Sequence, residues 1–127
     1  GLVVPVIHDA DSLTISSVAK SIDALTRKGR QGTLKLEDVQ GGTFTVNNTG
    51  ALGSVASQPL VNYPQAAILT TEAIVKRPMV VHDAIAIRSI MNICLVFDHR
   101  VIDGAEAGVF TIAVKGLLEA MGPETAI

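Results

Sequence analysis

The segment LVFDHRVIDGAEAG, residues 95–108, decides the fold, because it joins the strongest predicted strand to the last predicted helix. An apolar run ends there, the polar residues Asp98, His99 and Arg100 follow, and Asp103 precedes a helical pattern. Junctions of this kind are ordinary places for turns and helix caps. They are also places where enzymes present reactive side chains on a rigid support.

Length and composition limit the possible classes of protein. The 127 residues suggest one domain, and 48% apolar residues with no tryptophan indicate an aliphatic core. A net charge of −2 without a basic block argues against a nucleic-acid surface, and the apolar runs are too short to cross a membrane. We expect no signal peptide before them. The single cysteine, Cys94, excludes an internal disulfide and suits a reducing compartment.

The first half of the chain predicts one helix between short strands. Residues 2–7 have a buried-strand pattern that starts abruptly, so we expect that a longer chain was cut here. Asp11 or Ser12 is expected to cap a helix that Gly29 and Gly32 end. The further elements are a connector at 33–42, a strand at 43–47, a loop at 48–59 and a turn at 61–65.

The second half predicts most of the sheet. Residues 66–75 indicate a buried strand, and 79–97 indicate a hairpin that turns near His82-Asp83 and continues as one long strand through Phe97. A helix is expected from Asp103 to a stop at Gly122-Pro123. The predicted fold is α/β (α+β): a two-layer sandwich with a mixed sheet and helices on one face.

His99 has two interpretations. An imidazole with an ordinary pKa of about 6.5, just past a rigid strand, is suited to act as a general base in a cleft. A partly buried histidine bonded to the backbone explains it equally well. Asp103 with Glu106 forms a capping-box pattern, so capping alone accounts for Asp103. Arg100 is explained by neutralisation of Asp98.

Other polar residues give weaker signals. His99 and Asp103 are only two possible ligands, so no metal site is predicted. His8 is expected in a surface turn, His82 at a hairpin tip, and Cys94 as a small apolar strand residue.

The glycine-rich segment at 41–54 has no phosphate-loop pattern. Asn47 ends a strand there and could donate to an oxyanion, although adjacent asparagines are commonly only turn formers.

Five segments together resemble a known family. GLVVPVI, KLEDVQGGTFTVNNTGALGS, VNYPQAAIL, IVKRPMV and DHRVIDG resemble blocks of the catalytic domain of dihydrolipoyl acyltransferases, in family order. These are core components of 2-oxo acid dehydrogenase complexes and belong to the chloramphenicol acetyltransferase-like superfamily. The family domain is about twice as long, so the resemblance implies that residues 1–127 are its C-terminal half.

The resemblance implies a reaction and three site residues. An acyl group, by resemblance a branched-chain one, would pass between dihydrolipoyl-lysine, carried on a separate lipoyl domain, and coenzyme A. His99 matches the catalytic histidine, and Asp103 matches a carboxylate that pairs with an arginine to hold the site. Asn47 stands where many relatives have Ser or Thr as oxyanion donor. No residue is assigned to cofactor binding.

The resemblance also implies partners and a location. The expected partners are copies of itself in trimers and a larger core, the lipoyl domain and the dehydrogenase components, with neither nucleic acid nor membrane. The active site would be a channel between subunits. A bacterial cytoplasm is the expected location, with a mitochondrial matrix as the alternative. Acetyl or succinyl transfer is the enzymatic alternative, and a non-catalytic assembly module is the rival from another class.

Overall fold

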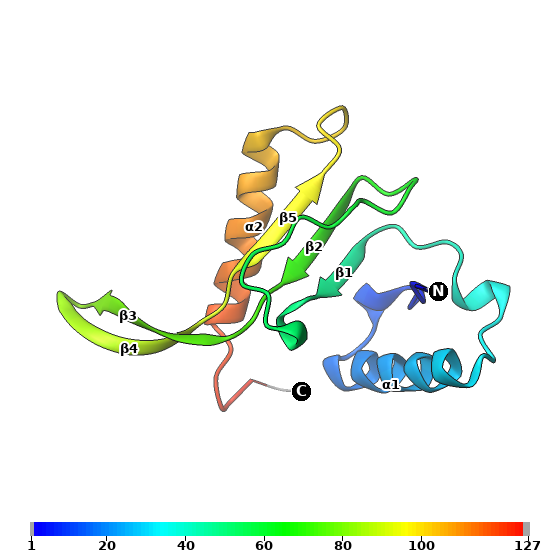
Figure 1. Cartoon of the computed structure of the whole chain (residues 1–127), viewed down its shortest axis with the longest axis horizontal. Helices are drawn as coiled ribbons and strands as arrows, with labels where there is room; N and C mark the ends of the chain where they lie inside the picture. The colour runs from blue at the N-terminus through cyan, green and yellow to red at the C-terminus, as the bar shows by residue number, and fades with distance from the viewer. Residues whose placement is uncertain (1, 126–127) are drawn as a thin grey trace. The chain divides into compact units, whose positions relative to one another are not determined.

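The computed structural model describes residues 2–125, which form two compact units (Figure 1). Of the described residues, the first unit contains 2–43 and 121–125, and the second contains 44–120. The prediction that the whole chain is one domain stays a prediction. The helices are α1 (Ile15–Gln31) and α2 (Gly104–Glu119), and the strands are β1 (Thr45–Asn48), β2 (Ala67–Thr71), β3 (Val75–Val81), β4 (Ala84–Ile90) and β5 (Ile93–Phe97).

The first unit is built around α1. The helix begins later than the sequence predicted, because Thr14, rather than Asp11 or Ser12, caps it by accepting a hydrogen bond from the Ser17 amide at 3.2 Å. As predicted, it ends at Gly32, whose φ of 67° only glycine adopts readily, but Gly29, which was also expected to end it, lies within the helix. Short 3-10 helices at Ala10–Ser12 and Leu36–Asp38 flank it.

Residues 2–7 are not a strand, so that prediction was wrong. They make one backbone hydrogen bond, from the Val6 amide to the Asp38 carbonyl at 2.8 Å, and none of the strands in residues 2–125 pairs with them. Their apolar pattern resembles a strand, but a strand also needs a partner for its backbone groups.

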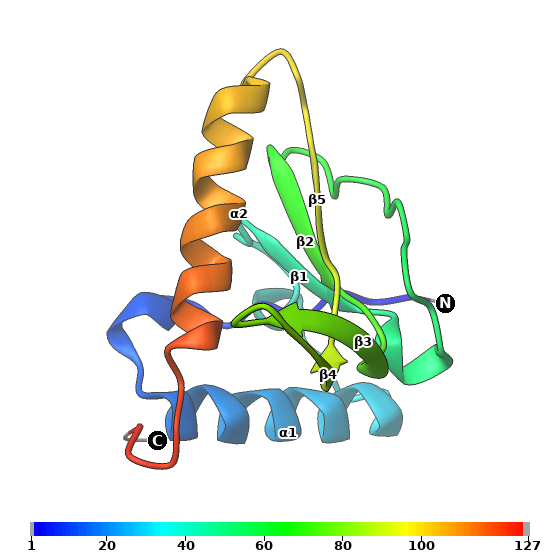
Figure 2. The same ribbon diagram turned by 90° about the vertical axis from the view of Figure 1, so that its left-hand side faces the viewer.

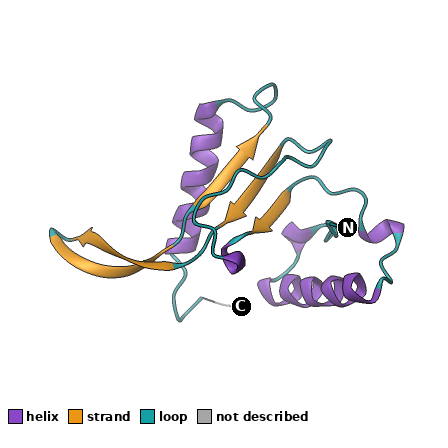
Figure 3. Ribbon diagram, in the orientation of Figure 1, coloured by secondary structure: helices purple, strands orange, loops and turns teal. Residues whose placement is uncertain are grey.

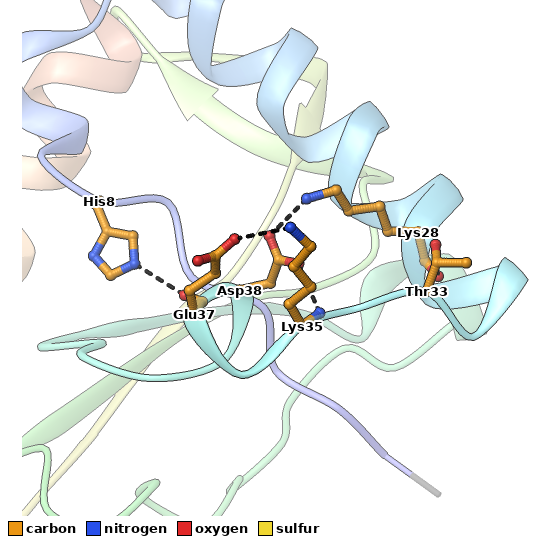
Figure 4. A network of polar contacts seen from close by, with 6 residues as sticks. All are labelled: His8, Lys28, Thr33, Lys35, Glu37 and Asp38. Atoms are coloured by element: carbon orange, nitrogen blue, oxygen red, sulfur yellow. Dashed lines mark hydrogen bonds and ion pairs between the residues drawn. The ribbon is translucent and has the colours of Figure 1, made fainter.

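A polar network in the same unit fixes the connector after α1 (Figure 4). Asp38 accepts hydrogen bonds from the Lys28 ammonium at 2.8 Å and from the Lys35 amide at 2.9 Å. Both bonds lower the pKa of Asp38, and the bond from Lys28 has the larger effect. A ring nitrogen of His8 lies 3.2 Å from the Glu37 carbonyl oxygen. His8 therefore belongs to an exposed turn, as predicted.

The second unit contains the mixed sheet. Its order is β1-β2-β5, with β1 parallel and β5 antiparallel to β2. The central strand β2 holds the core, and its Thr70 is fully buried. Helix α2 lies against β5 (Figures 1 and 2), and the ring of Phe110 on α2 lies 5.8 Å from that of Phe44. The mixed sheet with a helix layer confirms the predicted fold class.

The long strand predicted through Phe97 is two strands in different sheets (Figure 3). β3 and β4 form a separate hairpin, whose tip at His82 and Asp83 confirms the predicted turn. The extended strand is interrupted at Asn92. Its side chain donates to the Val55 carbonyl at 2.8 Å, and its carbonyl accepts from the Glu72 amide at 3.1 Å. The strand predicted at 66–75 likewise stops at Thr71.

Candidate active site

His99 lies two residues beyond the end of β5. The preceding Asp98 amide still bonds the Ala66 carbonyl at 2.8 Å, and the Asp98 carbonyl accepts from the amides of Val101 and Ile102. The sheet and a tight turn therefore hold the backbone on both sides of His99. Its ring is exposed and tilts against that of Phe97 at 5.5 Å between centroids. Within residues 2–125 no hydrogen bond engages either ring nitrogen, so both nitrogens are open to a ligand or another partner.

His99 lies on an open groove of about 740 Å³. One wall is β5 and the other is the segment that precedes β2. The lining that residues 2–125 provide is mainly apolar, with a few polar side chains and no Lys or Arg. The lining residues are Ala56, Ser57, Gln58, Cys94, Leu95, Val96, Phe97 and His99. Cys94 is a half-buried strand residue, as predicted.

Arg100 is held by Asp98, as the sequence predicted. Its guanidinium Nη2 lies 2.6 Å from Asp98 Oδ2, and its Nε donates to Asp98 Oδ1 at 3.0 Å. These hydrogen bonds lower the pKa of Asp98 to about 2. Because Arg100 is engaged in this way, it does not pair with Asp103.

Asp103 caps α2. Its Oδ1 accepts from the amides of Ala105 at 2.8 Å and Glu106 at 2.9 Å, and Glu106 Oε2 accepts from the Asp103 amide at 3.1 Å. This confirms the capping box. Asp103 Oδ2 makes no hydrogen bond among residues 2–125, so one oxygen stays available for another partner.

Asn47 and His99 are not brought together in one chain. Asn47 pairs with Thr70, and Thr70 pairs with Cys94, so Asn47 is level with the beginning of β5 and two strands away from it. Strand spacings put it roughly 10 Å across the sheet from Cys94, and the end of β5 roughly 10 Å farther along. The two predicted site residues lie at opposite ends of the sheet.

Sequence reasoning missed Glu72. It directly follows β2 and is only 2% exposed. Ser57 donates to its Oε1 at 2.5 Å and Thr49 to its Oε2 at 2.9 Å. The sequence signal was a single acidic residue inside an apolar run, which predicts either a strand end or a buried polar site.

The described residues contain no group of three or more His, Cys, Asp or Glu placed to hold a metal ion. Neither helix in residues 2–125 is long and apolar enough to span a lipid bilayer.

Comparison with known proteins identifies the class to which this fold and site belong. The family model described as 2-oxoacid dehydrogenases acyltransferase (catalytic domain) matches residues 1–126. The chain belongs to this family. The structure also resembles a probable dihydrolipoamide acetyltransferase of Listeria monocytogenes, with a TM-score of 0.94, 48% identity, 97% of this chain covered and 53% of that one.

Three further relatives show the range of the family. A lipoamide acyltransferase component of the branched-chain alpha-keto acid dehydrogenase complex of Bacillus subtilis is 53% identical over 99% of this chain. A succinyltransferase component of the 2-oxoglutarate dehydrogenase complex of Haemophilus influenzae is 46% identical over 94% of it. The chain spans 30% and 29% of these two proteins, respectively.

The third is a solved dihydrolipoamide acetyltransferase of Azotobacter vinelandii, with a TM-score of 0.91, 36% identity, 94% of this chain covered and 49% of that one. Its description assigns roles in the catalytic mechanism to a serine, a histidine 52 positions later and an asparagine four positions after the histidine.

Proposed function

We propose that this chain is part of an acyltransferase that moves an acyl group between dihydrolipoyl-lysine and coenzyme A in a 2-oxo acid dehydrogenase complex. The observation that carries the proposal is the exposed His99 imidazole, held by the sheet at one end of an open groove with no hydrogen bond to its ring within residues 2–125. Membership of the family supports the reaction class.

The chemistry follows from a free imidazole. An ordinary thiol with a pKa near 8.5 has little thiolate at neutral pH, so a base is needed to remove its proton. In the proposal, a His99 nitrogen takes the proton of the attacking thiol. The sulfur attacks the thioester carbonyl carbon and a tetrahedral oxyanion forms. The bond to the leaving sulfur then breaks, and the imidazolium returns the proton to that sulfur.

Asn47 and Asp103 take supporting roles in the proposal. The Azotobacter serine precedes its histidine by 52 positions, and Asn47 precedes His99 by the same interval. The asparagine of that protein follows its histidine by four positions, as Asp103 follows His99. The Asn47 amide would donate to the oxyanion, while Asp103 holds the start of α2 and offers Oδ2 to a residue outside this chain.

A complete site needs a second copy in this proposal. His99 and Asn47 lie at opposite ends of one sheet, so a single chain cannot present both to one carbonyl. Pairing His99 of one copy with Asn47 of the next would meet this requirement. A solved relative described as the cubic core of the pyruvate dehydrogenase multienzyme complex supports self-assembly. The lipoyl domain and dehydrogenase components are then the other expected partners.

The acyl group proposed is a branched-chain one. It is supported by 53% identity to the Bacillus subtilis branched-chain component, against 46% for the Haemophilus influenzae succinyl component. Succinyl and acetyl transfer are the alternatives. A bacterial cytoplasmic location also stays a prediction, which cell fractionation would test.

The test is acyl transfer to dihydrolipoamide by the full-length protein, with isobutyryl-, acetyl- and succinyl-coenzyme A. We expect transfer with at least the first, and Asn47→Ala should lower turnover roughly a hundredfold if one oxyanion donor is lost. No transfer from any of the three would overturn the proposal.

A non-catalytic assembly module is the second candidate. It is favoured by apolar side chains that α2 exposes, among them Val109 and Ile112. Light scattering would show assembly in either case. Assembly without transfer would favour the module.

A further inference from the structure

Glu72 is a buried acid without a cationic partner. Both of its carboxylate oxygens accept from hydroxyl groups, Oε1 from Ser57 and Oε2 from Thr49, and no ion pair involves Glu72 among residues 2–125. Buried carboxylates are usually paired with a cation, because removal of a charge from water is costly. A carboxylate held only by hydroxyl groups therefore calls for an explanation beyond stability.

The surroundings of Glu72 favour its charged form. The hydrogen bond from Ser57 lowers its pKa most, burial opposes this, and the hydroxyl of Thr49 lowers the pKa further. Glu72 is consequently an anion at neutral pH.

Its two hydrogen-bond donors connect this anion to the groove and to the end of β1. Ser57, which bonds Glu72 directly, also lines the groove. Thr49, the other donor, follows Asn47 by two residues. Asn48 pairs with Thr71, the residue before Glu72, so Asn47 and Glu72 lie at the same end of the sheet. In the proposal, a thioester whose carbonyl oxygen is bound by Asn47 would therefore hold its acyl group at the end of the sheet that contains Glu72.

Among residues 2–125, no groove side chain would balance a second negative charge. Its lining contains no Lys or Arg, and Leu95, Val96 and Phe97 contribute apolar surface. Arg100, the next cation along the chain, is engaged by Asp98. An acyl group ending in a carboxylate would come close to the charge of Glu72, which lies behind Ser57, with no cationic partner in the groove among residues 2–125, whereas a branched aliphatic group would contact apolar side chains.

We propose that Glu72 selects the acyl group by charge, so that its carboxylate excludes acyl chains that carry a carboxylate and leaves neutral aliphatic acyl groups as substrates. The inference rests on the proposed acyltransferase function and names its substrate class. Glu72 acts as a specificity residue and takes no part in the proton transfer.

The first test compares kcat/KM for isobutyryl- and succinyl-coenzyme A in the full-length protein. Glu72→Gln keeps the size of the side chain and removes its charge. The preference for isobutyryl should fall at least about tenfold, mainly through faster use of succinyl-coenzyme A, because one close like charge is removed. Glu119→Gln is the matched control, since it removes an exposed charge at the end of α2, and it should leave the preference unchanged. An unchanged preference in Glu72→Gln would overturn the inference.

The second test needs no variant, so it can confirm or overturn the role of Glu72 even if the Glu72→Gln protein does not fold. The wild-type protein is given succinyl-coenzyme A and its analogue with an amide in place of the terminal carboxylate. We expect at least about tenfold higher kcat/KM for the amide, because the two differ little except in charge. Equal values, whether high or at the detection limit, would overturn charge selection.

The two proposals fail in different ways. Loss of transfer with every acyl group, isobutyryl included, contradicts the acyltransferase function itself. Transfer that does not respond to the charge of the acyl group contradicts only the role of Glu72.

Discussion

At His99, a short stretch of backbone determines what the side chain can do. Backbone bonds on both sides hold it at the groove, and within residues 2–125 its ring nitrogens make no hydrogen bond. Cys94, on the same strand, is fixed in the sheet and lines the groove from the wall. His99 differs from Cys94 because it lies beyond the last residue pair between β2 and β5, where side chains are no longer confined to one face of the sheet.

Asp103 was open to two interpretations from sequence, and the structure confirms the capping one. Asp103→Ala should lower the free energy of unfolding by about 1 kcal/mol, because two amides of α2 lose their acceptor. Asp103→Asn, which can still cap, should lose only a few tenths of a kcal/mol. Chemical denaturation measures both, and equal losses in the two variants would contradict the capping role.

The Asp98–Arg100 pair predicts a pH dependence of stability. The folded-state pKa of Asp98 is lowered from 3.8 to about 2 by Arg100, so the charged carboxylate stabilises the fold. This contribution is fully present above about pH 4 and is lost as the pH falls through about 2. The difference in free energy of unfolding between wild type and Asp98→Asn should therefore shrink over that range. A difference that stays constant from pH 5 to pH 2 would contradict the pair.

Single residues were predictable where they carry a recognisable local pattern. Asp103 with Glu106, and Asp98 with Arg100, are near neighbours in sequence, so their contacts could be predicted. Glu72 could not, because its donors Thr49 and Ser57 reach it only through the pairing of β1 with β2 and the loop between them. Contacts of this range depend on the tertiary fold.

At the scale of elements, the helices were easier to predict than the strands. Helix α1 follows a clear 3.6-residue apolar pattern, and both helices have an N-cap side chain and end near a glycine, signals that are local. The sequence could not show that β4 and β5 belong to different sheets, since the apolar pattern runs through both. The break depends on Asn92 bonding to Val55 and Glu72, which are distant in sequence.

Gly50, in the loop after β1, packs closely against the backbone of Glu72. A Cβ atom there would lie 2.4 Å from the Glu72 carbonyl carbon and oxygen, and backbone cannot easily move away. Gly50→Ala should therefore destabilise the fold by about 1–3 kcal/mol. Gly116→Ala is the matched control, because its Cβ meets nothing within 4 Å in the last turn of α2, and it should be neutral or stabilising. Thermal unfolding distinguishes them, and similar melting temperatures would contradict the close packing.

At the scale of the whole molecule, the separation of His99 from Asn47 predicts complementation between subunits. His99→Ala and Asn47→Ala full-length proteins are each expected to be weakly active. When the two are unfolded together in equal amounts and reassembled, random mixing should restore about a quarter of the wild-type turnover. In about a quarter of the sites, the copy that supplies His99 and the copy that supplies Asn47 both carry the intact residue. Turnover no higher than the mean of the separate variants would contradict a site built from two copies.

The most direct test of the account is the effect of His99→Ala on kcat/KM for transfer from isobutyryl-coenzyme A to dihydrolipoamide in the full-length assembly. His82→Asn, which replaces an exposed imidazole at the hairpin tip, is the control. The account predicts a loss of roughly a hundredfold to ten-thousandfold for His99→Ala, with assembly unchanged, and little effect of the control. A His99→Ala protein within about twofold of wild type would contradict the assignment of His99 as the base.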